Sequence, residues 1–444
     1  MTGEKQQTIQ YTTSLQLADH PLGRVKQEIK ESYYVALESL VRRYTTNSMF
    51  AEARLEQYRT LLCAGSSPSS LSEQEAQKNL RLMINDRLRP WRKRYRYFLI
   101  VDTALILCNE TAIKQAKKGL EAYLSTRQFE ELVKVTELLF MKGRIDNKWS
   151  YLEPIIQQYK TNADHAKLPE LRILITANMS AGKSTLVNAL IGKPVARTSQ
   201  EACTAHLNYF YSKSFEDGRV HISNTTLKLD ASFDDVNKAE ATSGQHVATY
   251  FTMMIQTQHR LCVIDTPGVN SAMNPEHAKL TRNALIHEKY DKLIYVLNAS
   301  QLGTDEDMRH LRYVANNVPE EKTIFVLNKL DSFRAKEDSI AESILRVRED
   351  LQELGYHNPI ICPISAYFSL LLKLKQQGED LTEDELDDYE RLVNKFAKEE
   401  FHLSNYYGSA SFQDKRIDEV PFLQNSYRSG MLNFEKVLYG GELK

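Results

Sequence analysis

The sequence predicts an α/β fold, with a mainly parallel sheet flanked by helices, preceded by an all-helical bundle or stalk. Three observations support this prediction. Residues 24–165 carry apolar side chains at helical spacing and no convincing strand pattern. From residue 171 onward, short apolar runs alternate with helical patterns, which is typical of βαβ units with a buried parallel sheet. The first run, at 171–176, leads into a loop that ends in Gly-Lys-Ser at the start of a helical pattern.

Length and composition indicate an ordinary globular protein of two or three domains. The chain has 444 residues, of which 42% are hydrophobic and 26% charged, and its net charge is -1. A neutral chain exerts no general electrostatic attraction on nucleic acid or anionic lipid, so a nucleic-acid partner is not expected. The sequence has no Cys-x-x-Cys pair, no signal-peptide pattern and no apolar stretch of about 18 residues. We therefore expect a reduced, cytoplasmic location, with peripheral contact with a membrane as an open alternative.

The amino-terminal part is predicted to be helical after a loose polar arm. Residues 1–23 are polar and end in His-Pro-Leu-Gly, so we expect a flexible arm. Residues 24–165 divide at turn-forming residues into a bundle or stalk of helical segments. The expected segments are 24–62, 73–90, 91–109, 111–124, 128–141 and 146–162. The apolar run 98–108 is too short to span a membrane and is interpreted as a buried helix.

A basic run with interleaved aromatic residues lies at 87–97. Such a run can bind phospholipid head groups or nucleic acid. It is also typical of a solvated helix face whose aromatic residues, here Trp91, Tyr95 and Phe98, point inward. We favour this second interpretation, because one basic cluster on a neutral protein is common.

The second part of the chain begins after a polar connector at 162–170. The apolar runs expected to form strands are 171–176, 207–213, 218–223, 260–265, 292–297, 323–328 and 359–364. Residues 231–250 are interpreted as an insertion between strands. The acidic stretch 379–390 contains a capping-box pattern and continues into an apolar stripe that ends at Phe396. We expect a surface helix there and assign no chemistry to its charges.

The loop at 177–185, Ala-Asn-Met-Ser-Ala-Gly-Lys-Ser-Thr, matches a phosphate-binding loop except that Ala177 replaces the usual first glycine. Gly182 allows the backbone to approach an anion closely, and Lys183 places a positive charge on the outer phosphates. The hydroxyl group of Ser184 is a ligand for Mg²⁺. The predicted phosphate-binding residues are Asn178, Met179, Ser180, Ala181, Gly182, Lys183, Ser184, Thr185 and Gly268.

Two further segments complete a magnesium site that responds to the nucleotide. The run 261–268 ends in Asp-Thr-Pro-Gly, where Asp265 can hold Mg²⁺ through water and the N–H of Gly268 can reach the γ-phosphate. In segment 194–206 a hydroxyl group must complete the Mg²⁺ coordination. We prefer Thr204 over Thr198, because Thr204 lies just before the next strand. Arg197 of the same segment is either an internal arginine finger or a surface arginine, and we favour the surface arginine.

A guanine-binding pattern follows at 324–331, which ends in Asn-Lys-Leu-Asp. The carboxylate of Asp331 can accept hydrogen bonds from N1–H and the 2-amino group of guanine, and adenine has neither donor. Lys329 can lie against the base plane, and Asn328 can reach the purine edge. Near the last strand, Ser365 can shape a turn in which the backbone N–H of Ala366 contacts the guanine O6. Together these motifs predict a P-loop GTPase domain that binds GTP and GDP.

The particular motifs resemble those of the dynamin family, including its bacterial members. The resemblance covers about 171–440 and is strongest in Met179–Gly192, in Thr204 before a strand and in Asp265–Gly268. Two later segments, Phe368–Leu371 and Ser429–Glu435, add to it. The resemblance implies a large Mg²⁺-dependent GTPase that is activated by homodimerisation across the nucleotide face, often at membranes.

The resemblance also implies catalytic roles. Ser180 would help to position the attacking water or a charge-compensating cation. With Lys183 on the outer phosphates and Thr204 completing the Mg²⁺ coordination, it makes up the expected catalytic set. Eukaryotic dynamins carry a water-orienting Gln where Met179 stands, so the water-positioning group of this chain is not identified. Family members usually continue into further stalk helices beyond this domain. The chain is therefore either a portion of a longer protein or one whose amino-terminal bundle alone serves as the stalk.

Three hypotheses of function follow. The leading one is a Mg²⁺-dependent, dynamin-like GTPase activated by self-association. The second is a nucleotide-gated module for protein interaction with little hydrolysis, which Met179 motivates. The third is a GTPase associated with ribosomes or nucleic acid, which the basic run 87–97 motivates, although no RNA-binding module is recognisable after the GTPase domain.

Overall fold

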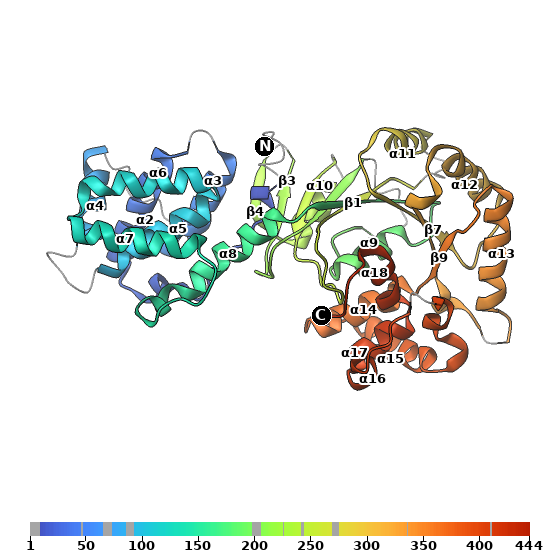
Figure 1. Ribbon diagram of the computed structural model, residues 1–444. Coiled ribbons are helices and arrows are strands. Elements are labelled where there is room, and N and C mark those ends of the chain that lie inside the picture. The colour runs from blue at the N-terminus through green and yellow to red at the C-terminus, as the bar shows by residue number, and fades with distance from the viewer. Residues whose placement is uncertain are drawn as a thin grey trace. The chain divides into compact units, whose positions relative to one another are not determined.

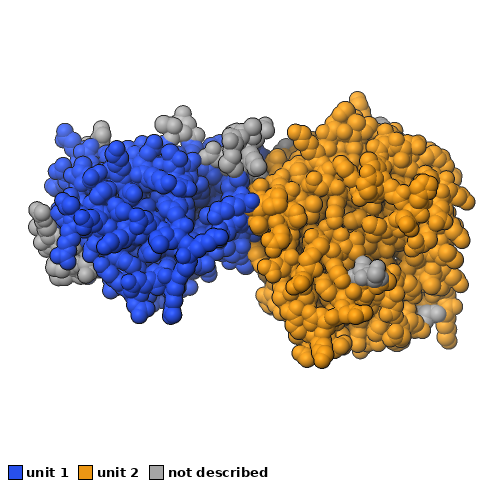
Figure 2. Space-filling model, viewed as in Figure 1, with its two compact units in different colours: residues 1–167, 213–230 blue, residues 168–212, 231–444 orange. Residues whose placement is uncertain are grey.

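The computed structural model forms two compact units, which Figure 2 shows in separate colours. One unit comprises residues 1–167 and 213–230, and the other comprises residues 168–212 and 231–444. The residues that the structure describes are 9–45, 48–64, 73–85, 93–197, 206–224, 226–240, 244–268, 275–334, 336–408 and 411–444.

The first unit is a helical bundle, seen in blue to blue-green in Figure 1. Its helices are η1 (Pro21–Arg24), α2 (Gln27–Arg43), α3 (Met49–Cys63), α4 (Glu73–Ile84), α5 (Lys93–Leu107), α6 (Glu110–Leu120), η3 (Glu121–Tyr123), α7 (Thr126–Phe140), η4 (Asn147–Leu152) and α8 (Glu153–Lys167). The central helix is α5, which packs against α2, α3, α4, α6, α7 and α8. A helix that is apolar on all sides has to be enclosed by others, and this confirms the prediction of a buried helix at 98–108.

Two polar side chains of α5 are buried and hydrogen-bonded. The carboxylate of Asp102 accepts hydrogen bonds from the hydroxyl groups of Tyr33, at 2.5 Å, and Tyr58, at 3.0 Å. Arg96 is buried and donates to the hydroxyl of Tyr97 at 2.9 Å. Arg96 belongs to the predicted basic run, but residues 86–92, including Trp91, lie outside the described part of the chain. Phe98 is buried, as the interpretation of an inward aromatic face predicts.

The prediction of a loose arm at 1–23 is wrong for the described residues 9–23. The backbone N–H of Ser14 donates to Oδ1 of Asn162 at 2.9 Å, and its hydroxyl donates to the carbonyl of Phe215 at 2.6 Å. The N–H of Leu15 donates to Asp217 at 2.9 Å. These groups of Ser14 and Leu15 are satisfied by residues more than 140 positions away, and a local sequence pattern cannot reveal such partners.

Residues 213–230, which we predicted as part of the GTPase domain, also belong to the first unit. Lys213 is buried and donates to Oδ1 of Asp217 at 2.5 Å, while the hydroxyl of Tyr11 donates to the carbonyl of His221 at 2.7 Å. The neighbouring strands β3 (Val220–Ser223) and β4 (Leu227–Ala231) lie in this segment. The buried side chains of Lys213 and Asp217 pair with each other, and Asp217 and His221 bond the arm, so this part of the predicted GTPase domain packs as part of the first unit.

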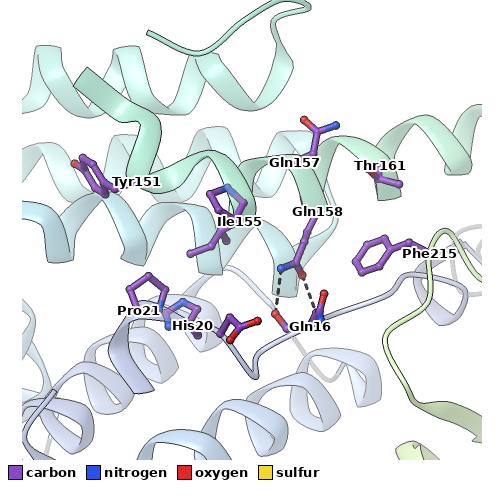
Figure 3. Close-up of a pocket in the computed structure, with 11 residues that line it drawn as sticks. Gln16, His20, Pro21, Tyr151, Ile155, Gln157, Gln158, Thr161 and Phe215 are labelled. Atoms are coloured by element: carbon purple, nitrogen blue, oxygen red, sulfur yellow. Dashed lines mark hydrogen bonds between the residues drawn. The ribbon is translucent and has the colours of Figure 1, made fainter. Parts of the chain in front are cut away.

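A cavity of about 320 Å³ opens in the first unit beside the arm. Figure 3 shows Gln158 of α8 reaching across to the backbone of Gln16, with which it exchanges two hydrogen bonds of 3.0 Å. His20 and Phe215 also line this cavity. The cavity thus lies where the arm, α8 and segment 213–230 meet within one unit.

The second unit contains the parallel sheet and its flanking helices. Its strands are β1 (Glu170–Ala177), β2 (Asn208–Ser212), β5 (His246–Thr249), β6 (Arg260–Asp265), β7 (Lys292–Asn298), β8 (Thr323–Asn328) and β9 (Ile360–Pro363). They lie in the order β5-β2-β6-β1-β7-β8-β9. All neighbours in this order are parallel except β2 and β6, which are antiparallel. The predicted α/β fold with a mainly parallel sheet is therefore confirmed. The insertion predicted at 231–250 contains α10 (Phe233–Glu240) and the strand β5, which extends this sheet.

Helices cover the sheet, and Figure 1 shows α11 and α12 on one side of it and α9, α14 and α18 on the other. The other helices of this unit, besides α10, are α9 (Lys183–Ile191), α11 (Pro275–His287), α12 (Asp305–Asn317), η5 (Glu320–Lys322), η6 (Leu330–Ser332), α13 (Ile340–Glu353), α14 (Ala366–Gln376), α15 (Glu383–Phe396), η7 (Glu399–Phe401), η8 (Leu403–Tyr406), α16 (Arg416–Glu419), α17 (Pro421–Arg428) and α18 (Met431–Tyr439). Among the described residues no helix combines the length and apolarity needed to cross a membrane.

The register of the sheet brings the predicted motifs to one edge. Ile175 of β1 stands opposite Asp265 of β6, and Asn298 of β7 stands opposite Asn328 of β8. The carboxyl ends of these parallel strands meet at the same edge, which is where ligands bind in open α/β sheets. The loops after β1, β6, β8 and β9 thus form the candidate site.

Candidate functional site

The loop between β1 and α9 has the conformation that its glycine requires. Gly182 has φ +85°, and a Cβ atom added to it would overlap Nδ2 of Asn328. Only glycine combines this left-handed backbone with so close an approach. Ser180 also has a positive φ, of +63°, and Ala177, at the departure from the usual motif, is fully buried. The loop is therefore packed closely against the loop that follows β8.

The predicted lysine and aspartate of the site face each other. Nζ of Lys183 lies 2.5 Å from Oδ1 of Asp265, and both side chains are buried. Burial raises the pKa of Asp265, and the Lys183 ammonium partly offsets this by favouring the ionised carboxylate. The second oxygen of Asp265, Oδ2, is buried and has no hydrogen-bond partner among the described residues.

The unpartnered Oδ2 atom of Asp265 bears on whether these residues could hold Mg²⁺. A buried carboxylate oxygen without a donor is costly, and a Mg²⁺-bound water donates to such an atom. Ser184 stands in the first turn of α9, directly after Lys183. Asp265 and Ser184 both carry the oxygen atoms that Mg²⁺ prefers as ligands, so the residues present fit the ion. Thr204 and Thr198 lie outside the described residues.

The glycine of the Asp-Thr-Pro-Gly motif lies beside the phosphate loop. A Cβ atom added to Gly268 would stand 3.6 Å from Cα of Met179. The preceding Thr266 donates from its hydroxyl to the carbonyl of Ile175 at 2.9 Å, which fastens this segment to β1. Met179 itself is 50% exposed. The loop thus presents an apolar side chain to solvent beside Gly268.

The predicted guanine-binding residues come together from two loops. Ser365 donates from its hydroxyl to Oδ1 of Asp331 at 2.7 Å. The Asn328 side chain donates to the carbonyl of Ala181 at 3.0 Å, and its Oδ1 accepts from the backbone N–H of Ala366 at 3.0 Å. In this structure Asn328 therefore ties the phosphate loop to the loop after β9. This differs from the predicted contact of Asn328 with a purine edge and of the Ala366 N–H with guanine O6.

Lys329 lies between Asn328 and Asp331 in the sequence and has a left-handed backbone, with φ +68°. Its Cε atom would lie 3.9 Å from a Cβ added to Gly182. The stem of Lys329 therefore passes beside the phosphate loop.

A buried network beneath the phosphate loop has no counterpart in the sequence prediction. The amide of Asn178 donates to Oδ1 of Asp307, in the first turn of α12, and the hydroxyl of Tyr295 donates to the same oxygen at 2.9 Å. Burial raises the pKa of Asp307 to about 6. Nearby, Oγ1 of Thr176 lies 2.9 Å from Nε2 of His310.

The only local signal for Asp307 is the pattern Thr304-x-x-Asp307, and it indicates a helix cap rather than a contact with a loop. The structure shows the cap as well, since the hydroxyl of Thr304 accepts from the backbone N–H of Asp307 at 3.3 Å. The second contact depends on the pairing of β1 with β7, which places α12 next to the loop.

Comparison with known proteins gives a family match for part of this unit. Residues 173–330 match the model of the Dynamin family. The chain is 26% identical over 203 residues to the "Probable transmembrane GTPase FZO-like, chloroplastic" of Arabidopsis thaliana, covering 46% of this chain and 20% of that protein. It is 24% identical over 192 residues to "Dynamin-like protein A" of Bacillus subtilis, covering 42% of this chain and 15% of that protein. The match thus spans a fifth or less of each of these two relatives.

Among solved structures, the chain is similar to Toc33 from Arabidopsis thaliana in complex with GDP and Mg²⁺. The identity is 16%, the match covers 52% of this chain and 78% of that one, and the TM-score is 0.29. A score this low supports no conclusion about the site.

Proposed function

Because residues 173–330 form a GTPase domain of the dynamin family, we propose that the chain binds GTP with Mg²⁺ and hydrolyses it to GDP and phosphate. The observation that carries the proposal is the chain of hydrogen bonds from Ala181 through Asn328 to Ala366, together with the bond between Ser365 and Asp331. It joins a phosphate-binding loop to a carboxylate suited to guanine. A chance Gly-Lys-Ser tripeptide has no reason to be connected in this way.

The proposed reaction is attack of water on the γ-phosphate. The new bond joins the water oxygen to the γ-phosphorus, and the bond to the bridging oxygen of GDP breaks. Lys183 exchanges its contact with Asp265 for the outer phosphates, and the backbone N–H groups of residues 180–185 and Gly268 hold the anion. The protein thus contributes position and charge, without a covalent nucleophile.

When bound, Mg²⁺ would supply positive charge to the phosphate oxygens. Ser184 and Thr204 would hold it directly, and Asp265 would hold it through water. The unpartnered Oδ2 atom of Asp265 supports this assignment. Asp331 selects guanine, because with adenine its carboxylate would lose both donors.

Self-association is the part of the proposal that explains hydrolysis. Met179 cannot orient water, and Ser180 offers one hydroxyl for that task. The exposed Met179 beside Gly268 supports a second copy that covers the nucleotide face and completes the site. We further propose a cytoplasmic protein with peripheral contact with membranes.

The test is GTP turnover measured against protein concentration, with and without anionic vesicles. A rate per molecule that rises with concentration is expected, and Lys183→Ala should abolish turnover. Hydrolysis that persisted in Lys183→Ala would overturn the proposal. A slow rate at every concentration despite GTP binding would favour the second candidate, a nucleotide-gated interaction module, for which the exposed apolar Met179 is the supporting observation.

A further inference from the structure

The helix α15 makes a contact with the guanine-binding loop that its acidic sequence does not suggest. Nζ of Lys395, in the last turn of α15, donates to three backbone carbonyl groups. The distances are 3.3 Å to Leu330, 2.7 Å to Asp331 and 2.6 Å to Phe333. These carbonyl groups belong to the 3-10 turn η6 and the residue that follows it, and η6 carries Asp331.

The chemistry of these carbonyl groups explains why a lysine suits the position. The last carbonyl groups of a helical turn carry partial negative charge and are short of partners within the turn. Of the three, that of Leu330 also accepts the backbone N–H of Phe333, at 3.3 Å. An ammonium group has three donors, and Lys395 uses them on three carbonyl groups at once. The turn also follows Lys329, whose left-handed backbone is unfavourable for a non-glycine residue and persists only where its surroundings fix it.

The side chain of Lys395 is itself held in place. Its ammonium lies 4.6 Å from the ring centre of Phe401, and burial lowers its pKa to about 8. The next residue, Phe396, stacks on Phe368 of α14 with ring centres 5.2 Å apart and planes 6° apart. Helix α14 begins directly after Ser365, the residue whose hydroxyl bonds Asp331. The two supports of Asp331 therefore come from helices that pack on each other.

We propose that Lys395 is a positioning residue for guanine selection, which holds the 330–333 turn so that the Asp331 carboxylate meets both donors of the base. Ser365 orients the carboxylate from its side chain, and Lys395 fixes the backbone from which that side chain projects. The inference rests on the proposed GTP binding at this site. It adds that selection of the base depends on a helix outside the nucleotide motifs.

The test compares GTP with ITP, which lacks the 2-amino group of guanine. In the wild-type chain, GTP should bind more tightly than ITP, because Asp331 accepts two hydrogen bonds from guanine and one from hypoxanthine. In Lys395→Met we expect the affinity for GTP to fall about tenfold, which corresponds to the loss of one hydrogen bond to a charged group. The affinity for ITP should fall less. The ratio of the two dissociation constants should therefore shrink, and Lys395→Arg, which keeps charge and donors, should restore much of it.

Controls separate this role from general stabilisation. Lys398→Met changes an exposed lysine three residues further along, beyond the end of α15, and should leave the ratio unchanged. A GTP-to-ITP ratio that stays at the wild-type value in Lys395→Met would overturn the inference, even if both affinities or the melting temperature fell. If Lys395→Met does not fold, Lys395→Gln is measured in the same way, and an unchanged ratio there has the same meaning. Absence of GTP binding by the wild-type chain would instead refute the proposed function.

Discussion

Replacing Asp307 with asparagine should stabilise the protein at neutral pH. Asp307 is 5% exposed, and burial raises its pKa from the ordinary value of 3.8 to about 6. An acid whose pKa is raised by folding favours the folded state only while it is protonated. Its contribution is complete below the unfolded pKa of 3.8 and is lost as the pH rises through about 6. The asparagine side chain has the same shape and stays neutral, so it does not incur this loss.

The size of the effect follows from the two pKa values. Each unit of difference corresponds to about 1.4 kcal/mol, so the ionised Asp307 costs about 3 kcal/mol at pH 7 and about 1.5 kcal/mol at pH 5. The amide oxygen of the new asparagine can still accept the hydrogen bonds that Asn178 and Tyr295 donate to Asp307. The predicted gain of stability should therefore grow by about 1.5 kcal/mol between pH 5 and pH 7.

The assay is urea unfolding of the wild type and Asp307→Asn at pH 5, 6 and 7. Asp305→Asn serves as a matched control, because it removes a negative charge from an exposed position in the same first turn of α12. The free energy of unfolding of this control should fall by up to about 1 kcal/mol, because a negative charge at a helix N-terminus is favourable. A difference between wild type and Asp307→Asn that does not change with pH, or a variant that is less stable at pH 7, would refute the reasoning.

Three further substitutions test the site and its support. Gly182→Ala should abolish nucleotide binding in a titration with fluorescent GTP, because the new Cβ overlaps the amide of Asn328 at a left-handed backbone position; wild-type binding would contradict this. In competition binding, Asp331→Ala should weaken the affinity for GTP by about a hundredfold and leave the affinity for ATP unchanged. An equal loss of affinity for both nucleotides would argue against guanine selection at this residue. Lys373→Met should lower the free energy of unfolding by about 3 kcal/mol, because it leaves buried Glu435 without the ammonium that lies 2.8 Å away. The double variant with Glu435→Gln should recover part of that loss, and no recovery would show that the ion pair is not the cause.

The parts of the fold that sequence could predict are those that local patterns specify. Continuous apolar runs identified β1, β6, β7 and β8 close to their observed bounds, because parallel strands buried on both faces need apolar side chains throughout. Strand β5 was missed, since its four residues include an exposed histidine and carry no such run. The predictions for the arm and for segment 213–230 were wrong for another reason. The structure of both segments depends on hydrogen bonds between residues about 200 positions apart.

The candidate site shows the same division. Each motif contains a residue type whose chemistry is local, such as Lys183 or Asp331, and sequence spacing is enough to find it. What fixes these residues in place is not local. Asp307 supports Asn178 from the helix after β7, and Lys395 supports Asp331 from a helix after the last strand. Neither supporting residue belongs to a nucleotide motif.

A physical reason makes such supports necessary at this edge of the sheet. Loops that hold a nucleotide must point their backbone N–H groups at the ligand, so they cannot satisfy their own polar groups by forming regular structure. Asn328 meets part of this need by bonding the carbonyl of Ala181 and the N–H of Ala366. The carbonyl groups of Leu330, Asp331 and Phe333 accept hydrogen bonds from another element, through the ammonium of Lys395. Helices around the site therefore supply the donors that the carbonyl groups of its own loops lack.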